Sequence, residues 1–252
     1  QMMDWSHYQK IIYGHTIAIL GFNNHEITLS VLKQIRKSGC NDHILFFDNG
    51  SNPSFEKLID DPNFSYHWEK NNIYVNPAWN KIFDLVSTRY LTLLNNDCFI
   101  ETQNYFGEII PDMEKNNIIL SSCKTKNIPY YNVIVQYIFK MKYYRFKNST
   151  LSFSSESRRQ GWLMTLNLDK YKKLDYKIPE YLKVWYGDDW IWSQILLNDL
   201  NSVIYTNRYA LHVRATSTSK IPDIIQSDVE NLEKYGDWYQ NITEIMHSKK
   251  YA

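Results

Sequence analysis

The chain has few or none of the features that mark several large classes of protein. It contains three cysteines in 252 residues, Cys40, Cys98 and Cys123, with no closely spaced pair. This pattern argues against a disulfide framework and a cysteine-ligated zinc site, and it fits a reducing compartment. No apolar run approaches the roughly 18 residues of a transmembrane helix. The N-terminal segment QMMDWSHYQK lacks the apolar core of a signal peptide, so we expect a soluble, cytoplasmic protein.

An excess of charge of one sign is also missing. Lys and Arg number 28 against 27 Asp and Glu, a formal net charge of +1. This balance argues against a nucleic-acid partner, whose binding surface ordinarily carries a basic excess. Hydrophobic residues make up 44% of the chain, enough for a globular core. The 20 tyrosines and 8 tryptophans either stack on sugars and bases or fill that core.

The first hundred residues alternate between expected strands and expected helices. Apolar runs predict strands, and helical spacing of apolar residues predicts helices, over 16–20 (strand), 26–37 (helix), 43–47 (strand), 55–59 (short helix), 64–68 (strand), 77–86 (helix) and 90–94 (strand). This order predicts an α/β fold with a single Rossmann-like, mostly parallel sheet flanked by helices. Later elements are expected at 118–122, 161–168, 201–205 and 210–213 (strands), and at 190–197 and 223–247 (helices).

Polar residues follow the expected strands at the points where they end. Asn23 and Asn24 follow the first strand, Asp48 and Asn49 the second, and Asn-Asn-Asp at 95–97 follows the strand at 90–94. The carboxyl ends of parallel strands meet at one edge of a sheet, where open α/β folds bind ligands. An acid there can hold a divalent cation against a phosphate. Each cluster taken alone is equally an ordinary Asn/Asp turn.

Several segments in series resemble the family 2 glycosyltransferases of the GT-A fold, especially the rhamnosyl- and glucosyltransferase-like branch. They are TIAILGFNNHEITLSVLKQI, HILFFDNGSN, EKNNIYVNPAWNKI, LTLLNNDCFI, GWLMTLNLDKY followed by VWYGDDWIWSQIL, and ALHVRATSTS. They occur in the family's order from Thr16 to Ser217. Asn95 fills the position of the first acid in the more familiar metal motif, and Ile73 stands where that family commonly has glycine.

The resemblance implies an inverting, metal-dependent transfer of a sugar from a nucleotide-diphosphate sugar, of the UDP or dTDP type, to a glycan or other hydroxyl acceptor. It makes Asp97 a metal ligand and His212 either a second ligand or a phosphate contact. Mn²⁺ or Mg²⁺ accepts few protein ligands when phosphates complete the shell, and an imidazole ligand favours Mn²⁺. The alternative for His212 is a hydrogen-bonded histidine beside a strand.

The resemblance also implies a set of contacts to the nucleotide sugar. Asp48 would accept a hydrogen bond from a pyrimidine N–H. The alternative is a turn residue, because Asp-Asn-Gly is strong turn chemistry, and both can hold because a turn presents the side chain. The expected nucleotide-sugar-binding residues are Phe22, Asn23, Asp48, Asn49, Asn80, Asn95 and Asn96.

An inverting transfer needs a general base that deprotonates the acceptor hydroxyl. The adjacent acids Asp188 and Asp189 are the candidates, with Asp189 preferred by its place in the motif. Acids at a helix N-terminus are also ordinary caps, so one acid can cap while the other faces the crevice. Trp162 and Trp190 flank these segments and either stack on acceptor sugars or belong to the core.

We expect one domain over 1–252, with a nucleotide-binding half at 1–100, an acceptor-binding half at 101–222 and closing helices at 223–252. The basic, serine-rich segment Tyr130–Arg159 is either a lid ordered by donor binding or a solvated basic face. The alternative function is a non-catalytic module of the same fold that binds a nucleotide sugar or a glycan. A nucleotidyltransferase is disfavoured, because no glycine-rich basic loop follows the first strand.

Overall fold

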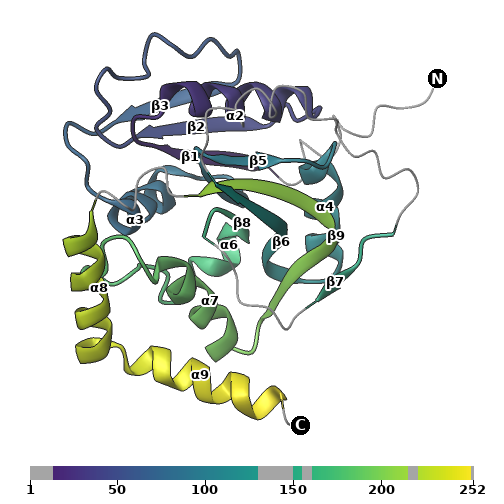
Figure 1. Cartoon of the computed structure of the whole chain (residues 1–252). Coiled ribbons are helices and arrows are strands. Elements are labelled where there is room, and N and C mark those ends of the chain that lie inside the picture. Colours follow the sequence, from purple (N-terminus) through teal and green to yellow (C-terminus); the bar gives the residue numbers. More distant parts are fainter. Residues whose placement is uncertain (1–13, 130–149, 155–160, 215–220, 251–252) are drawn as a thin grey trace.

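The computed structural model describes residues 14–129, 150–154, 161–214 and 221–250, and a large sheet runs through its centre with helices on both faces (Figure 1). Within these residues the strand order is β3-β2-β1-β4-β8-β6-β9-β5, and β7 pairs with β9 outside this path. The part of the chain that the structure describes contains no helix that is both long and apolar enough to span a membrane.

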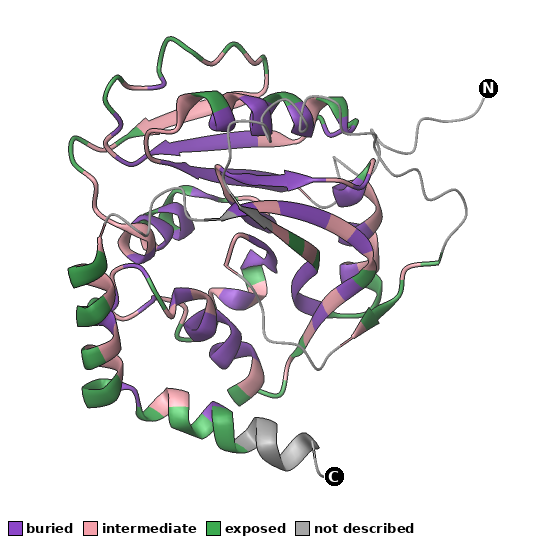
Figure 2. Cartoon of the chain, viewed as in Figure 1, coloured by how far each residue is buried: buried purple, intermediate pink, exposed green. Residues whose placement is uncertain are grey.

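The first four strands form a parallel unit. They are β1 (His15–Gly21), β2 (His43–Asp48), β3 (Phe64–Trp68) and β4 (Tyr90–Asn95). Helices α2 (His25–Lys37) and α3 (Val75–Leu85) cross over between strands of this unit. Every residue of β1 is buried, as expected for a strand covered on both faces (Figure 2). These elements confirm the predicted α/β fold.

The second half of the sheet is mixed. Strand β8 (Leu163–Asn167) runs antiparallel to β4 and to β6 (Ile118–Pro129). Strand β9 (Asn201–Arg214) is parallel to β6 and antiparallel to β5 (Cys98–Ile100) and β7 (Phe153–Ser154). The two strands expected at 201–205 and 210–213 are thus one strand, with an irregular register against β6 between Cys123 and Lys124.

Two apolar cores lie on opposite faces of the sheet, because successive side chains of a strand alternate between its faces. Ile17 and Ile19 of β1 belong to the core that includes residues of α2 and α4 (Tyr105–Lys115). Ala18 and Leu20 belong to the core that includes residues of α3, α6 (Leu168–Tyr171), α7 (Gly187–Leu197) and α9 (Asp237–Lys250). Helix α8 (Pro222–Tyr235) lies at the periphery, mostly exposed or half-buried (Figure 2).

One local expectation was wrong, and one helix was not predicted. The segment at 55–59 forms a turn rather than a short helix, with the Leu58 N–H bonded to the Phe55 carbonyl. Helix α4 was not expected, although Pro111 lies inside it. Proline in a helix interior removes one hydrogen bond and argues against a helix, and the apolar face of α4 overrides that preference.

Candidate functional site

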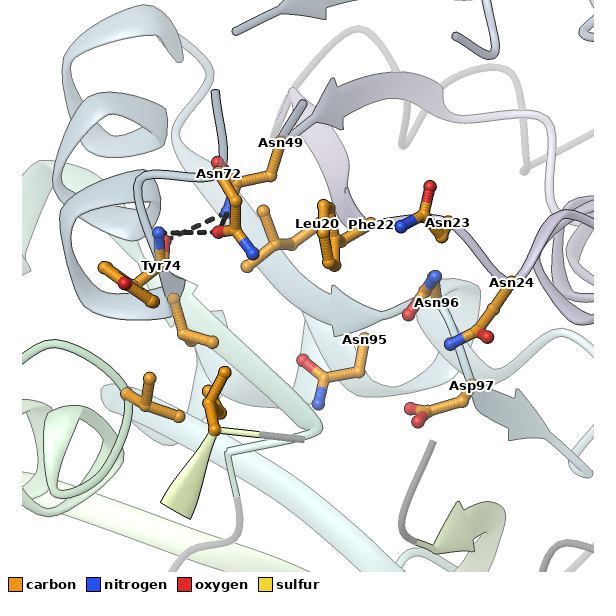
Figure 3. Close-up of a pocket in the computed structure, with 13 residues that line it drawn as sticks. Leu20, Phe22, Asn23, Asn24, Asn49, Asn72, Tyr74, Asn95, Asn96 and Asp97 are labelled. Atoms are coloured by element: carbon orange, nitrogen blue, oxygen red, sulfur yellow. Dashed lines mark hydrogen bonds between the residues drawn. The ribbon is translucent and has the colours of Figure 1, made fainter. Parts of the chain in front are cut away.

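A cavity lies where polar residues follow β1, β2 and β4 (Figure 3). The expected convergence of the strand ends is therefore present. Amide side chains dominate its wall, and among the described lining residues Asp97 is the one that carries a formal charge. The wall is formed by Leu20, Phe22, Asn23, Asn24, Asn49, Asn72, Tyr74, Val75, Asn95, Asn96, Asp97, Val184 and Ile221.

The two predicted metal ligands face each other, and Asp97 of this pair lines the cavity. The Nε2 atom of His212 lies 3.5 Å from Oδ1 of Asp97, and both side chains are largely buried. The antiparallel pairing of β5 with β9 places Cys98, the residue after Asp97, opposite His212. Two further contacts orient the imidazole: Nδ1 donates to Oδ1 of Asn127 at 2.9 Å, and the ring of Trp162 stacks on it at 4.3 Å.

This arrangement fits a divalent cation. A histidine that donates one ring N–H to an oxygen acceptor presents its other nitrogen as a metal ligand. Within the described ranges, no three His, Cys, Asp or Glu residues form a cluster that could hold a metal ion. The candidate protein ligands here are therefore two, Asp97 and His212. Mg²⁺ and Mn²⁺ commonly complete such a shell with phosphate oxygens and water. The pair is thus suited to a cation that binds together with a diphosphate.

Asp48 is placed in the turn rather than on the cavity wall. Its side chain is fully buried. Its Oδ1 accepts from the Ser51 N–H, and its Oδ2 accepts from the Phe55 N–H and, at 2.6 Å, from the Tyr66 hydroxyl. Burial of Tyr66, together with the carboxylate beside its hydroxyl, raises the pKa of Tyr66 well above its usual value. The structure agrees with the turn alternative for Asp48.

Asn23 and Asn96 connect the strand ends on either side of the cavity. The Asn23 N–H donates to the Ser51 hydroxyl, and its Oδ1 accepts from the Asn52 N–H, which ties the end of β1 to the loop after β2. Nδ2 of Asn96 donates to the Thr28 hydroxyl in α2. Phe22 and Asn95 also line the cavity. The sequence therefore identified this part of the wall correctly.

Asn80 does not reach the cavity. Its Nδ2 donates to the Ile178 carbonyl at 2.8 Å, and its Oδ1 accepts from the Ile178 N–H at 2.9 Å. The Lys177 ammonium donates to its backbone carbonyl. Asn80 thus connects α3 to the 177–178 segment through hydrogen bonds, and it does not join the other residues predicted to bind the nucleotide sugar.

Tyr74 adopts a backbone conformation that glycine normally occupies, with φ 69° and ψ 179°. The sequence placed the glycine position of this segment at Ile73, and the structure corrects it by one residue. Side chains on both sides hold the conformation: Oδ1 of Asn72 accepts from the Tyr74 N–H, and Nδ2 of Asn49 donates to the Tyr74 carbonyl. The strained residue lines the cavity.

The acidic pair occupies the first turn of α7. Asp189 is 2% exposed, whereas Asp188 is half-buried beside Gly161. A Cβ atom added to Gly161 would lie 3.2 Å from Cβ of Asp188. The next residue, Trp162, accepts the Asn95 N–H through its carbonyl at 3.0 Å. Asp188 is therefore linked to the end of β4 through the start of β8, and it is the more accessible acid.

The two predicted acceptor tryptophans have different environments. Trp162 is half-buried against His212, at the site. Trp190 is 8% exposed and packs edge-on against Trp238 of α9, with ring centroids 5.1 Å apart. The structure places Trp190 in the core, the alternative that the sequence left open. The expected lid at Tyr130–Arg159 lies mostly outside the described residues.

Sequence reasoning missed part of the cavity wall. Asn72 was not among the predicted contacts, although it lies in the segment EKNNIYVNPAWNKI, so the richness in asparagine was a usable signal. Val184 and Ile221 carry no local signal, because tertiary packing alone brings them to the cavity.

Comparison with solved structures shows the same fold in several sugar-transferring enzymes. GalNAc-T7 with UDP, GalNAc and Mn²⁺ matches at a TM-score of 0.70 and 12% identity, over 90% of this chain and 50% of that one. The mannosyltransferase PcManGT from Pyrobaculum calidifontis, with GDP-Man and Mn²⁺, matches at 0.61 and 8%, over 94% and 74%. S. aureus TarS 1-349 with UDP-GlcNAc matches at 0.60 and 12%, over 85% and 64%.

The chain thus spans about half of the GalNAc-T7 chain and 64% of the TarS chain. No curated protein matches it by sequence. The family model for glycosyl transferase family 2 matches residues 17–174, which include the strands and asparagine clusters of the cavity. This match and the shared fold confirm the resemblance seen in the sequence. The chain belongs to glycosyl transferase family 2 and has the GT-A fold.

Proposed function

We propose that the protein is an inverting, metal-dependent glycosyltransferase that takes a sugar from a UDP- or dTDP-type donor and delivers it to a hydroxyl of a glycan or another acceptor. The observation that carries this proposal is the Asp97–His212 pair, whose Oδ1 and Nε2 atoms are 3.5 Å apart, with Asp97 on the wall of a cavity formed by strand ends. The complexes of its structural relatives with UDP, GDP-Man or UDP-GlcNAc, two of them with Mn²⁺, support a nucleotide-sugar donor.

Asp97 and His212 would hold Mn²⁺ or Mg²⁺ through a carboxylate oxygen and an imidazole nitrogen. A divalent cation bound there neutralises charge on the diphosphate leaving group. Asn127 and Trp162 keep the imidazole in one orientation, so the site is largely formed before ligand arrives. The asparagines of the wall supply amide donors and acceptors for the hydroxyl and phosphate oxygens of the donor.

Asp189 is our candidate for the general base, with Asp188 as its alternative. The base takes the proton of the acceptor hydroxyl while the oxygen forms its bond to the anomeric carbon. The bond from that carbon to the diphosphate oxygen breaks on the opposite side, which inverts the anomeric configuration. The nucleoside diphosphate leaves with the electron pair. Asp188 is the more exposed of the two acids, whereas Asp189 is buried and lies in a drier environment.

The test is a panel of UDP-, dTDP- and GDP-sugars, with Mn²⁺ or with a chelator. We expect nucleotide binding by calorimetry, and metal-dependent release of nucleoside diphosphate. The anomeric configuration of the product, measured by NMR, tests inversion. Absence of both binding and donor hydrolysis across the panel contradicts the proposal.

Single substitutions separate an enzyme from a binding module. Asp189→Asn should abolish turnover and leave donor binding intact, and Asp188→Asn on the same helix turn is the matched control. If Asp188→Asn loses more turnover than Asp189→Asn does, Asp188 is the general base and Asp189 is not. Binding without turnover in the wild type, with acceptors supplied, indicates the non-catalytic alternative.

A further inference from the structure

Helix α8 is attached to the rest of the protein through a buried carboxylate. Asp228 is the fully buried residue within α8, at 0% exposure. Its Oδ1 accepts from the Lys183 N–H at 2.7 Å, and its Oδ2 accepts from the Val184 and Trp185 N–H groups at 2.7 and 2.8 Å. A hydrogen bond to an ionised acceptor is roughly twice as strong as a hydrogen bond to a neutral one. One side chain thus fixes three consecutive amides.

The opposite side of the same segment is held by α3. The Asn76 N–H donates to the Lys183 carbonyl at 2.9 Å, and Nδ2 of Asn76 donates to the Trp185 carbonyl at 2.9 Å. Asn76 is also fully buried. Segment 183–185 is therefore gripped between two helices by directional hydrogen bonds, which fix its position and its orientation.

This segment joins the cavity to the acidic pair. Val184 lines the cavity, and so does Ile221 at the start of α8. Helix α7 begins at Gly187, two residues after Trp185, and carries Asp188 and Asp189 in its first turn. A shift of 183–185 would move one wall of the cavity and the start of α7 together.

We propose that Asp228 is a positioning residue of the transfer reaction. By fixing segment 183–185 it holds Val184 at the cavity and sets where Asp188 and Asp189 stand relative to the donor. A helix that only covered a surface would be docked by apolar side chains, whereas the side chain that α8 buries fully is a carboxylate. The effect on catalysis rests on the proposed function, whereas the hydrogen bonds from segment 183–185 to Asp228 are independent of it.

Asp228→Asn tests this proposal, because an amide offers one acceptor oxygen and turns an NH₂ group toward the backbone N–H groups. We expect amide hydrogen exchange at 183–185 to quicken at least tenfold. With a donor that the wild type uses, kcat should fall about 10- to 100-fold, the scale of a misplacement of about 1 Å. The Kd of that donor's nucleoside diphosphate with Mn²⁺ should change less than about threefold, a split that a general loss of folding would not produce. Glu230→Gln, an exposed acid of the same helix, is the matched control and should change neither value.

Unchanged kcat in folded Asp228→Asn overturns the proposal, and so does a loss of nucleotide affinity as large as the loss in kcat. If Asp228→Asn does not fold, Asp228→Ser keeps one acceptor oxygen in a smaller side chain and is measured in the same way. Hydrogen exchange on the wild type gives an independent result: rapid exchange of the 183–185 amides contradicts the claim that Asp228 fixes this segment. A wild type that binds no nucleotide overturns the proposed function, while the exchange data still decide the role of Asp228.

Discussion

The imidazole of His212 faces the carboxylate of Asp97, with 3.5 Å between Nε2 and Oδ1. The two residues come from distant parts of the chain, and the antiparallel pairing of β5 with β9 brings them together. Neither side chain is free to swing away, because Asn127 and Trp162 hold the imidazole and Asp97 is 6% exposed.

Replacing Asn127 by leucine should weaken Mn²⁺ binding about 10-fold, since outer partners of a ligating histidine typically contribute 10- to 100-fold in affinity. His212→Ala should weaken it further, because it removes the ligand itself. Calorimetric titration of Mn²⁺ in the presence of nucleotide measures both. His67→Ala, which removes a histidine paired with Glu69, is the control and should bind Mn²⁺ like the wild type. Equal affinity in Asn127→Leu and wild type would show that this hydrogen bond does not orient the ligand.

Tyr74→Gly should raise the free energy of unfolding by about 1 kcal/mol, because a non-glycine residue in this conformation costs of order 1–3 kcal/mol. It should also weaken donor binding, since the ring lines the cavity. Ile73→Gly is the control, and should lower stability by about 0.5–1 kcal/mol. Urea unfolding at neutral pH compares the three proteins. If Ile73→Gly stabilised the protein and Tyr74→Gly destabilised it, Ile73 and not Tyr74 would be the position that favours glycine.

Trp190→Ala should lower the free energy of unfolding by about 3–5 kcal/mol, as expected for a large aromatic residue removed from a core. Trp190→Phe should fold and retain the wild-type KM for acceptor, because the ring packs against Trp238 rather than a ligand. Trp162→Phe, at the site, should weaken Mn²⁺ binding with a smaller loss of stability. Steady-state kinetics on Trp190→Phe provide the check: a raised acceptor KM would restore Trp190 to the acceptor site.

Asp61 should stabilise the protein at neutral pH and lose this effect in acid. The Arg36 guanidinium donates to both oxygens, at 2.6 and 2.8 Å, and holds the pKa of this carboxyl below its usual value. A lowered pKa in the folded state means that the stabilisation is complete above about pH 4 and is lost as the pH falls through the folded-state pKa.

Asp61→Asn should therefore lower the free energy of unfolding by about 1–3 kcal/mol at pH 7, and the difference should shrink as the pH falls through the folded-state pKa of Asp61. A series of urea unfolding experiments from pH 7 into acid measures it. Asp84→Asn removes an exposed pair with Lys177 and should change stability by less than about 1 kcal/mol. A difference for Asp61→Asn that stays constant with pH would show that packing, not charge, is responsible.

The sequence by itself determined the parallel half of the fold and the position of the site. Apolar runs that alternate with helical patterns admit few topologies, and parallel strands with right-handed crossovers end at one edge. Asn23, Asn95, Asn96 and Asp97 were therefore predictable as neighbours from local patterns. Local patterns did not predict α4, a helix that contains Pro111 and that packs its apolar face into the core.

Only the tertiary structure decided which polar groups remain available to a ligand. Asp48 and Asn80 have the residue types of a binding site, yet their polar atoms are used by Tyr66 and Ile178. Asp228 carries no local signal in the sequence and lies in a peripheral helix, yet it is fully buried. A pattern in the sequence reports which groups a residue carries. Whether those groups meet a ligand or another part of the chain depends on hydrogen bonds between segments distant in sequence, which form only when the fold is complete.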